Sequence, residues 1–352
     1  MKKVSLLFIA ILFSIFHVSA QDEEESGLQI SGSVDTYWKY DFSGYKDESG
    51  ISNIPTSFAD EQNSISVGMI DIALSQTVGK ASFVGEIAFG PRSFKSIPLF
   101  QPDGSDDVIV GIQNLYASYA FSDVFSLTAG YMGTFVGYEV ISPAGNFNYS
   151  TSYLFTNGPF QNSGIKADFA ISDRFAFMVG LFNDWNVYQD FNGISDFGAQ
   201  VYLMPVDGWD VYVNFVTGNP SGTVIDLTTG WQISDALYLG LNAADYSASG
   251  EDAGGYTGVA LYPQISLSDA IALGLRYEYF KFKEFTDEDL QNIASQNVNA
   301  FTLTANLKAG PLTVIPEFRL DGASDEFFSK NSEGSEFTKS ASQFLIAAVY
   351  AF

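Results

Sequence analysis

The chain of 352 residues has no cysteine and a single histidine, His17. Without cysteine there is neither a disulfide framework nor a lipid-modified cysteine. Without another histidine, the proton carrier of Ser-His hydrolases and the usual zinc ligands are missing. We therefore expect no enzyme, no catalytic residue, no cofactor and no metal site. These absences still leave carboxylate chemistry and hard cations open.

Long apolar runs are also missing, because no stretch of about 18 apolar residues exists that could form a membrane-spanning helix. The chain starts with Lys2 and Lys3, followed by a short apolar core over 6–16 and by the small residues Val18 and Ala20. This core is too short to cross a bilayer, and the pattern is typical of a secretory signal peptide.

Three segments follow from this start. We predict a signal peptide over residues 1–20, a short acidic segment over 21–26 and a single β-barrel domain over 27–352. The first alternating run begins at Gly27, which leaves no room for an amino-terminal plug domain and argues against an active-transport receptor.

Basic residues are scarce, with 16 Lys and Arg against 41 Asp and Glu and a net charge of −25. Such a chain does not bind nucleic acid through its phosphates. Aromatic residues make up 16% of the chain and glycine occurs 32 times, which excludes an acidic disordered protein. An exported, cysteine-free chain rich in tyrosine and glycine fits a bacterial outer-membrane barrel.

Two-residue alternation is the main local signal of the sequence. Apolar residues alternate with polar or small ones over 125–131, 271–279 and 312–320. Strands send successive side chains to opposite faces, so each segment has one apolar and one mixed face. The fold class is therefore all-β.

One turn motif occurs four times between such segments: FSDVF at 121–125, ISDRF at 171–175, ISDAL at 233–237 and LSDAI at 267–271. Across a three-residue hairpin loop, the two apolar residues of the motif would lie opposite each other and continue the apolar face. Serine and aspartate side chains can bond the turn amides. Three further tight links lie at 77–81, 204–209 and 308–312.

Long connections alternate with these seven short turns. They lie near 41–64, 91–109, 132–160, 184–195, 217–222, 246–254, 282–297 and 322–339. Eight long and seven short connections give sixteen strands, with both termini on the periplasmic side. Short turns at one end and long loops at the other are typical of an outer-membrane barrel. We predict a transmembrane antiparallel up-and-down β-barrel of about 16 strands.

The last segment, FLIAAVYAF, places alternate apolar residues on one face and ends at Phe352. This ending resembles the signal read by the barrel-assembly machinery, which we expect to be a partner. The outward faces carry residues compatible with hydrocarbon, and the four tryptophans fall near predicted strand ends, where aromatic girdles lie. Those tryptophans are Trp38, Trp185, Trp209 and Trp231.

A ring of sixteen strands is too wide for its own wall side chains to fill, so we expect water inside. Alternation points ten charged residues inward as candidate pore-lining groups that set the ion preference. The alternative is that single members are merely solvated wall residues. The ten are Asp35, Lys39, Asp71, Glu86, Lys166, Asp168, Arg276, Glu278, Glu317 and Arg319.

The long connection at 132–160 is rich in Gly, Asn, Tyr and Ser, and it carries a resemblance to a known family. The matching residues are GYE at 137–139, Pro143, Asn146, NYS at 148–150, Ser152, Phe155, GPF at 158–160, Gly164 and NDW at 183–185. They resemble the signature segment of the OmpL-like β-barrel porins, a porin-2 type family. One departure is Asp184, where the family tends to have glycine. The resemblance implies a porin-like outer-membrane protein and carries no catalytic residues.

We hypothesise that this connection folds into the barrel and narrows it, as the third loop does in general porins. Glu139, Asn146, Tyr149 and Ser152 would then face the passage. The alternatives are a loop folded over the rim and a loop packed against a neighbouring barrel.

The resulting functional hypothesis is a porin-like channel for passive diffusion of small hydrophilic solutes or ions, with a mild cation preference. The alternative is a closed structural or binding barrel, acting as adhesin, receptor or lipopolysaccharide contact through cations held by acidic loops such as 322–339. An enzyme ranks last. The expected surroundings are outer-membrane lipids and lipopolysaccharide, and the sequence leaves open whether the protein is a monomer or a homotrimer.

Overall fold

The computed structural model describes residues 27–96, 110–250, 253–286 and 292–352. The predicted signal peptide at 1–20 and the acidic segment at 21–26 lie outside the described residues, as does most of the connection at 91–109. Among the described residues, no helix has the length and apolar character needed to cross a membrane.

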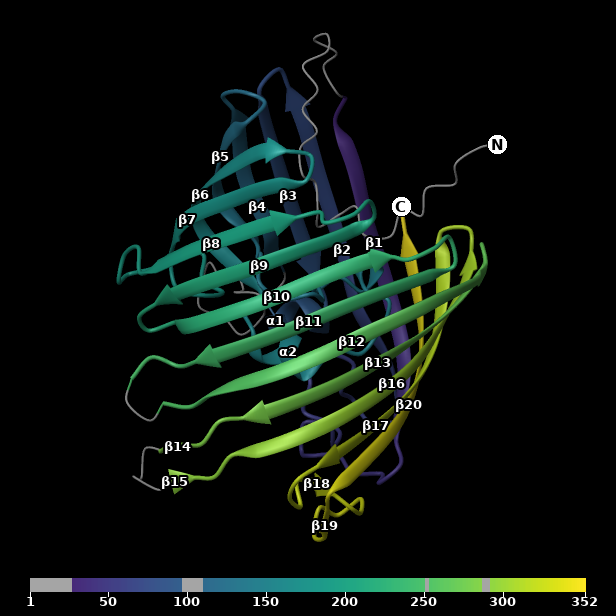
Figure 1. Cartoon of the computed structure of the whole chain (residues 1–352). Helices are drawn as coiled ribbons and strands as arrows, with labels where there is room; N and C mark the ends of the chain where they lie inside the picture. The colour runs from purple at the N-terminus through teal and green to yellow at the C-terminus, as the bar shows by residue number, and fades with distance from the viewer. Residues whose placement is uncertain (1–26, 97–109, 251–252, 287–291) are drawn as a thin grey trace.

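Sixteen antiparallel strands form one closed barrel, and each barrel strand pairs with the next along the chain (Figure 1). The first and last strands pair with each other and complete the ring. This confirms the predicted fold. The barrel strands are β1 (Gln29–Asp41), β2 (Ser64–Val78), β3 (Ala81–Phe89), β4 (Gly111–Ala120), β5 (Phe125–Gly133), β6 (Gln161–Ser172), β7 (Phe175–Phe182), β8 (Asp196–Leu203), β9 (Trp209–Gly218), β10 (Gly222–Gln232), β11 (Leu237–Ser247), β12 (Gly255–Ser268), β13 (Ile271–Phe282), β16 (Gln296–Ala309), β17 (Leu312–Ala323) and β20 (Ser340–Ala351).

Short elements occur only in the connections of the described chain. Two small hairpins extend beyond the ring, β14 with β15 and β18 with β19. The short elements are helix α1 (Pro91–Ser96), 3₁₀ helix η1 (Pro143–Gly145), helix α2 (Tyr153–Asn157) and strands β14 (Phe285–Thr286), β15 (Asn292–Ile293), β18 (Phe328–Ser329) and β19 (Phe337–Thr338).

All fifteen connections lie where the sequence predicts them, but the connection predicted as long at 217–222 spans only residues 219–221. The turn geometry differs in detail from the expected three-residue loop. The amides of Phe121 and Ser122 both donate to the carbonyl of Phe125, at 3.0 and 3.2 Å, so a two-residue turn is combined with a bulge. The serine Oγ accepts a turn amide in all four motifs. The rings of Phe121 and Phe125 still stack, at 5.3 Å.

The outer surface of the ring is apolar, as the alternation predicts. Ile225, Leu303 and Phe301 are about half exposed on it, at 56%, 57% and 47%. Trp209 and Trp231 pair directly near the short-turn end and stack at 5.3 Å. Such a surface suits lipid, with aromatic rings at its edge.

Trp185 departs from the expected girdle. It follows β7, and its ring packs against Tyr246 at 5.2 Å, beside the buried pair Val216 and Val224. A connection that bends inward carries this tryptophan away from the lipid boundary.

The two faces of one strand predict opposite tolerance to charge. Leu261→Arg, on the outer face of β12, should lower the free energy of unfolding by about 2–4 kcal/mol, because the guanidinium enters lipid. Gln264→Arg, on the inner face of the same strand, should cost much less. Urea unfolding in lipid vesicles would measure the free energy of unfolding of both variants. Equal losses would contradict the assignment of faces.

Candidate functional site

Residues 134–160, here called the inner loop, leave the end of β5 and lie inside the barrel. Their partners are inward-facing side chains on strands around the ring. The amide of Gly137 donates to Asp226 of β10 at 3.1 Å, and the Asn148 amide group donates to Thr304 of β16 at 2.7 Å. Figure 1 shows α2, which belongs to this loop, within the outline of the ring. Only a segment inside the ring can reach both strands.

The inner loop has its own local structure. Gly137 adopts a φ of +91°, which favours glycine. The side chain of Asn146 accepts from the amide of Val140 at 2.9 Å and donates to its carbonyl at 2.6 Å, which fixes a compact turn around η1. Ser152 caps the start of α2, because its Oγ accepts the amide of Phe155 at 3.0 Å.

Two wall carboxylates hold the backbone of the inner loop. Glu317 accepts the amides of Tyr149 and Ser150, at 3.0 and 3.2 Å. Glu278 accepts the amides of Tyr153 and Leu154, at 2.9 and 2.8 Å. Each carboxylate therefore binds two consecutive peptide groups, and bonds to a charged acceptor are stronger than neutral ones.

A buried ion pair joins the loop to β13. Nη1 of Arg276 lies 2.7 Å from Oε1 of Glu139, and both side chains are almost fully buried. The same guanidinium donates to the carbonyls of Ser150 and Thr151, at 2.6 and 3.2 Å. Glu139 also accepts the amide and hydroxyl of Ser152, at 2.7 and 2.8 Å. These bonds offset the cost of burying both charges.

Arg319 of β17 extends this network. It pairs with Asp321 through bonds of 2.8 and 2.9 Å and donates to the carbonyl of Thr151 at 2.8 Å. The hydroxyl of Tyr153 donates to Asp321 at 2.8 Å. Burial raises the pKa of the Tyr153 hydroxyl well above its usual range, and the charge of Asp321 adds to the rise. The phenol therefore stays a donor.

Glycines on the wall leave room for three aromatic rings of the inner loop. A Cβ at Gly198 would lie 2.7 Å from the Phe135 ring, and one at Gly274 would lie 2.3 Å from the Phe147 ring. A Cβ at Gly240 would lie 2.3 Å from the hydroxyl of Tyr138. These glycines mark places where another part of the chain approaches the wall closely. The aromatic residues of the loop thus dock on strands β8, β13 and β11.

A second inward segment covers the inner loop. Residues 51–60 of the connection between β1 and β2 bring Phe58 against Phe155, with ring centroids 6.0 Å apart. Arg92 of α1 lies between the rings of Phe58 and Tyr149, at 4.6 and 4.8 Å, and donates to the carbonyl of Ile141 at 3.2 Å. Protein therefore fills the space beside β1, β13, β16, β17 and β20.

All ten predicted wall charges lie on the inner face, but their surroundings fall into two groups. Three are partly exposed: Glu86, Lys166 and Asp168. Seven are buried: Asp35, Lys39, Asp71, Arg276, Glu278, Glu317 and Arg319. The expectation that water would surround all ten therefore does not hold. The reason is that the chain's own connections fill one side of the wide ring.

The three buried wall charges of β1 and β2 form hydrogen bonds with neutral side chains. The hydroxyl of Tyr149 donates to Asp35, and Lys39 donates to Ser52. Asp71 accepts from Ser33, whose Oγ lies 3.2 Å from the hydroxyl of Ser142 in the inner loop.

The four residues expected to face the passage are also placed differently. Glu139 and Asn146 are each only 8% exposed, and Tyr149 and Ser152 are 0% and 1% exposed. Their polar atoms bond protein groups, as described above. These residues hold the loop in position, and other side chains line the open space.

Three charged members of the network are missing from the sequence-based set: Asp321, Asp226 and Arg92. Asp321 lies on the inner face of β17 two residues after Arg319, so alternation could have found it. Alternation along β10 places Asp226 on the inner face between Val224 and Thr228, so counting along that strand could have found it. Arg92 acts from a six-residue helix in a long connection, and the local pattern gives no signal for it.

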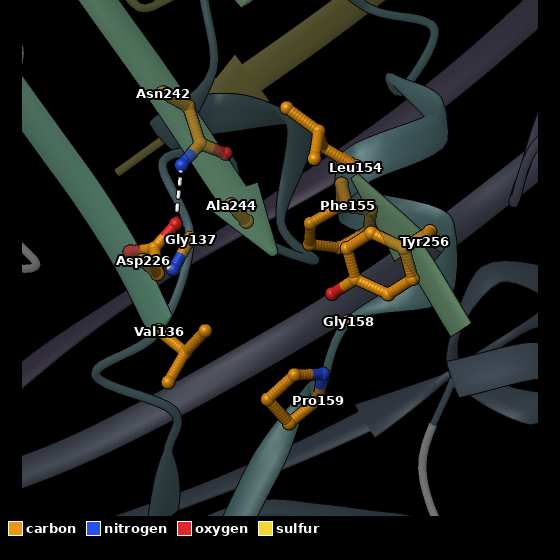
Figure 2. A pocket seen from close by; sticks show the side chains of 10 residues that line it. All are labelled: Val136, Gly137, Leu154, Phe155, Gly158, Pro159, Asp226, Asn242, Ala244 and Tyr256. Atoms are coloured by element: carbon orange, nitrogen blue, oxygen red, sulfur yellow. Dashed lines mark hydrogen bonds between the residues drawn. The ribbon is translucent and has the colours of Figure 1, made fainter. Parts of the chain in front are cut away.

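A small cavity lies where both ends of the inner loop meet the wall (Figure 2). Asn242 donates to Asp226 at one end of the cavity, and the hydroxyl of Tyr256 points into it. The lining residues are Val136, Gly137, Leu154, Phe155, Gly158, Pro159, Asp226, Asn242, Ala244 and Tyr256. In the described part of the chain, no cluster of three or more acidic or histidine side chains is placed to hold a metal ion.

Placing a side chain at a wall glycine where an aromatic ring docks should release the inner loop. Gly274→Val would force Phe147 out, because the new Cβ would lie 2.3 Å from its ring. We expect the barrel to fold but the segment 140–157 to become sensitive to protease. Gly85→Val is the matched control, since its Cβ would meet only Leu115, at 4.0 Å. Equal resistance of this segment to protease in both variants would contradict the docking of Phe147 against Gly274.

Breaking the buried ion pair should cost more than removing both charges. Arg276→Met leaves Glu139 charged and buried, so the free energy of opening the loop should fall by about 3–5 kcal/mol. Adding Glu139→Gln should recover part of this loss, because no uncompensated charge then remains. Hydrogen exchange of the amides at 149–154 measures both effects. Strictly additive losses would argue against the pair.

Three solved structures share this architecture, and one of them is described as an outer-membrane channel. Salmonella typhi OmpF in complex with daunomycin is 12% identical, with a TM-score of 0.59, covering 94% of this chain and 100% of that chain. The outer membrane channel DcaP of Acinetobacter baumannii is 11% identical, with a TM-score of 0.58, covering 92% and 97%. The trimer form of OmpT of Vibrio cholerae is 13% identical, with a TM-score of 0.55, covering 93% and 99%. At these identities the likeness shows the fold.

No curated protein matches the chain by sequence. A family profile, described as "Putative beta-barrel porin-2, OmpL-like", matches residues 27–352, which span the barrel from before β1 to the carboxyl terminus. The match confirms the resemblance seen around residues 131–185 and assigns the protein to the bacterial outer membrane. The chain belongs to this family of OmpL-like β-barrel porins.

Proposed function

We propose that the protein is a passive channel for small hydrophilic solutes and ions, narrowed by the inner loop. One observation carries the proposal. Several inward side chains along β3 to β6, such as Tyr116 and Lys166, are partly exposed, whereas the charged side chains that face the inner loop are buried. Water therefore has access to one side of the lumen, and the loop limits its width.

The rigidity of the narrowing supports this proposal. Glu278 and Glu317 each bind two peptide groups of the loop, and Arg276 binds two carbonyls. A constriction of this kind keeps a constant size and so sets a fixed limit for passive diffusion. The chain acts without catalysis in this proposal, since its family and structural relatives are porins.

Export and assembly complete the proposal. Residues 1–20 direct secretion and are removed, which the intact mass of the purified protein would show. The strand ending at Phe352 is recognised by the barrel-assembly machinery, and outer-membrane lipids and lipopolysaccharide surround the apolar face. A homotrimer is the proposed assembly because OmpT of Vibrio cholerae has a trimer form. Native mass spectrometry in detergent would distinguish it from a monomer.

Deleting 140–155 should widen the channel. These residues include the backbone held by Glu317, Glu278 and Arg276, so their removal opens the filled side of the lumen. In liposome swelling with sugars of graded size, the variant should admit larger sugars than the wild type. Deleting 331–335, at the tip of the β18–β19 hairpin, is the control and should change nothing. An unchanged size limit would contradict the constriction. A wild type that gives no swelling would favour the closed binding barrel.

A further inference from the structure

The burial of inward charges divides the lumen into a filled side and an open side. On β1, β13 and β17, charged residues of the inner face are buried against the connections inside the ring. On β3 to β6, several inner-face side chains are partly exposed, although others, such as Ser118 and Thr128, are buried. The partly exposed side chains are Val84, Glu86, Asn114, Tyr116, Ser126, Lys166 and Asp168. A solute that passes through the barrel therefore meets the charges of the open side.

Two of the three charges on the open side neutralise each other. Nζ of Lys166 lies 2.8 and 3.0 Å from the two carboxylate oxygens of Asp168, two residues along the same strand. The side chains are 27% and 34% exposed, so both are accessible from the lumen. Opposite charges at this distance produce a weak net field farther away.

Glu86 is the third charge, and its partner is neutral. Its carboxylate accepts a hydrogen bond from the amide group of Asn114 on the neighbouring strand, at 2.5 Å. None of the ion pairs among the described residues includes Glu86. The segments 97–109, 251–252 and 287–291 contain no lysine or arginine that could pair with it.

Two charged residues of opposite sign lie at inner-face positions of described strands near the short-turn end. Asp210, near the start of β9, accepts the hydroxyl of Tyr202 at 2.7 Å. Lys308, near the end of β16, lies on the same inner face as Asn306, two residues earlier. Along β3 to β6, Glu86 is therefore the inner-face charge that no described ion pair neutralises.

We propose that Glu86 determines the ionic selectivity of the channel and makes it prefer small cations over anions. This inference rests on the proposed function and names the class of solute. The preference arises inside the narrowed passage, where low-dielectric walls focus the field of a single carboxylate. The acidic external loops contribute less, because mobile ions in the medium screen their charge.

Charge variants on the open side test this inference through the reversal potential in a KCl gradient across a planar bilayer. Glu86→Gln should lower the potassium-to-chloride permeability ratio severalfold. Asp168→Asn should also lower it, because Lys166 is then free to offset Glu86. Lys166→Gln should raise it, because two uncompensated carboxylates then face the passage. The expected order of the ratio is therefore Lys166→Gln, wild type, then the two carboxylate variants.

Asp123→Asn is the control, because Asp123 lies on an exposed turn outside the passage. It should leave the ratio unchanged. Slower migration on gel electrophoresis after heating verifies that each variant was folded. A conducting wild type with an unshifted Glu86→Gln variant would overturn the role of Glu86 and leave the porin function standing. A wild type without conductance would overturn both the role of Glu86 and the proposed porin function.

Discussion

The structure depends on one constraint: in lipid, every backbone amide and carbonyl needs a partner within the protein. A sheet meets this requirement only when its first and last strands pair, as β1 and β20 do. Closure leaves the sheet without a free edge, and alternation along each strand sends side chains in turn to lipid and lumen. The apolar outer face, the inward charges and the enclosed space all follow from this closure.

The same requirement for hydrogen-bond partners applies to the backbone of the inner loop. A segment inside the ring carries peptide groups that need partners, and the backbone groups of the wall strands are largely paired with neighbouring strands. Side chains therefore take that role, with Glu278 and Glu317 receiving amides and Arg276 and Arg319 donating to carbonyls. The charges in turn need many bonds to offset their loss of water. The loop therefore depends on the wall for its position, and the buried wall charges depend on the loop for their partners.

The sequence predicted the barrel well because side-chain alternation and turn motifs are local signals. The Ser-Asp turns at 121–125 and 233–237, the strand count and the inward direction of Arg276 could all be read by counting along the chain. The surroundings of Arg276 could not be predicted in this way, because its partner Glu139 lies 137 residues away in sequence. Parity gives the face of a side chain, but burial depends on which distant segment covers that face.

The same distinction limits what net charge says about an ion channel. The chain carries a net charge of −25, yet most inward carboxylates, such as Glu278 and Glu317, bind protein groups away from the passage. A permeating ion responds to charges that remain accessible and unpaired along its path. Selectivity in this barrel is therefore a property of the surface that the inner loop leaves uncovered, and a change in the loop's position would change selectivity without altering any charged residue.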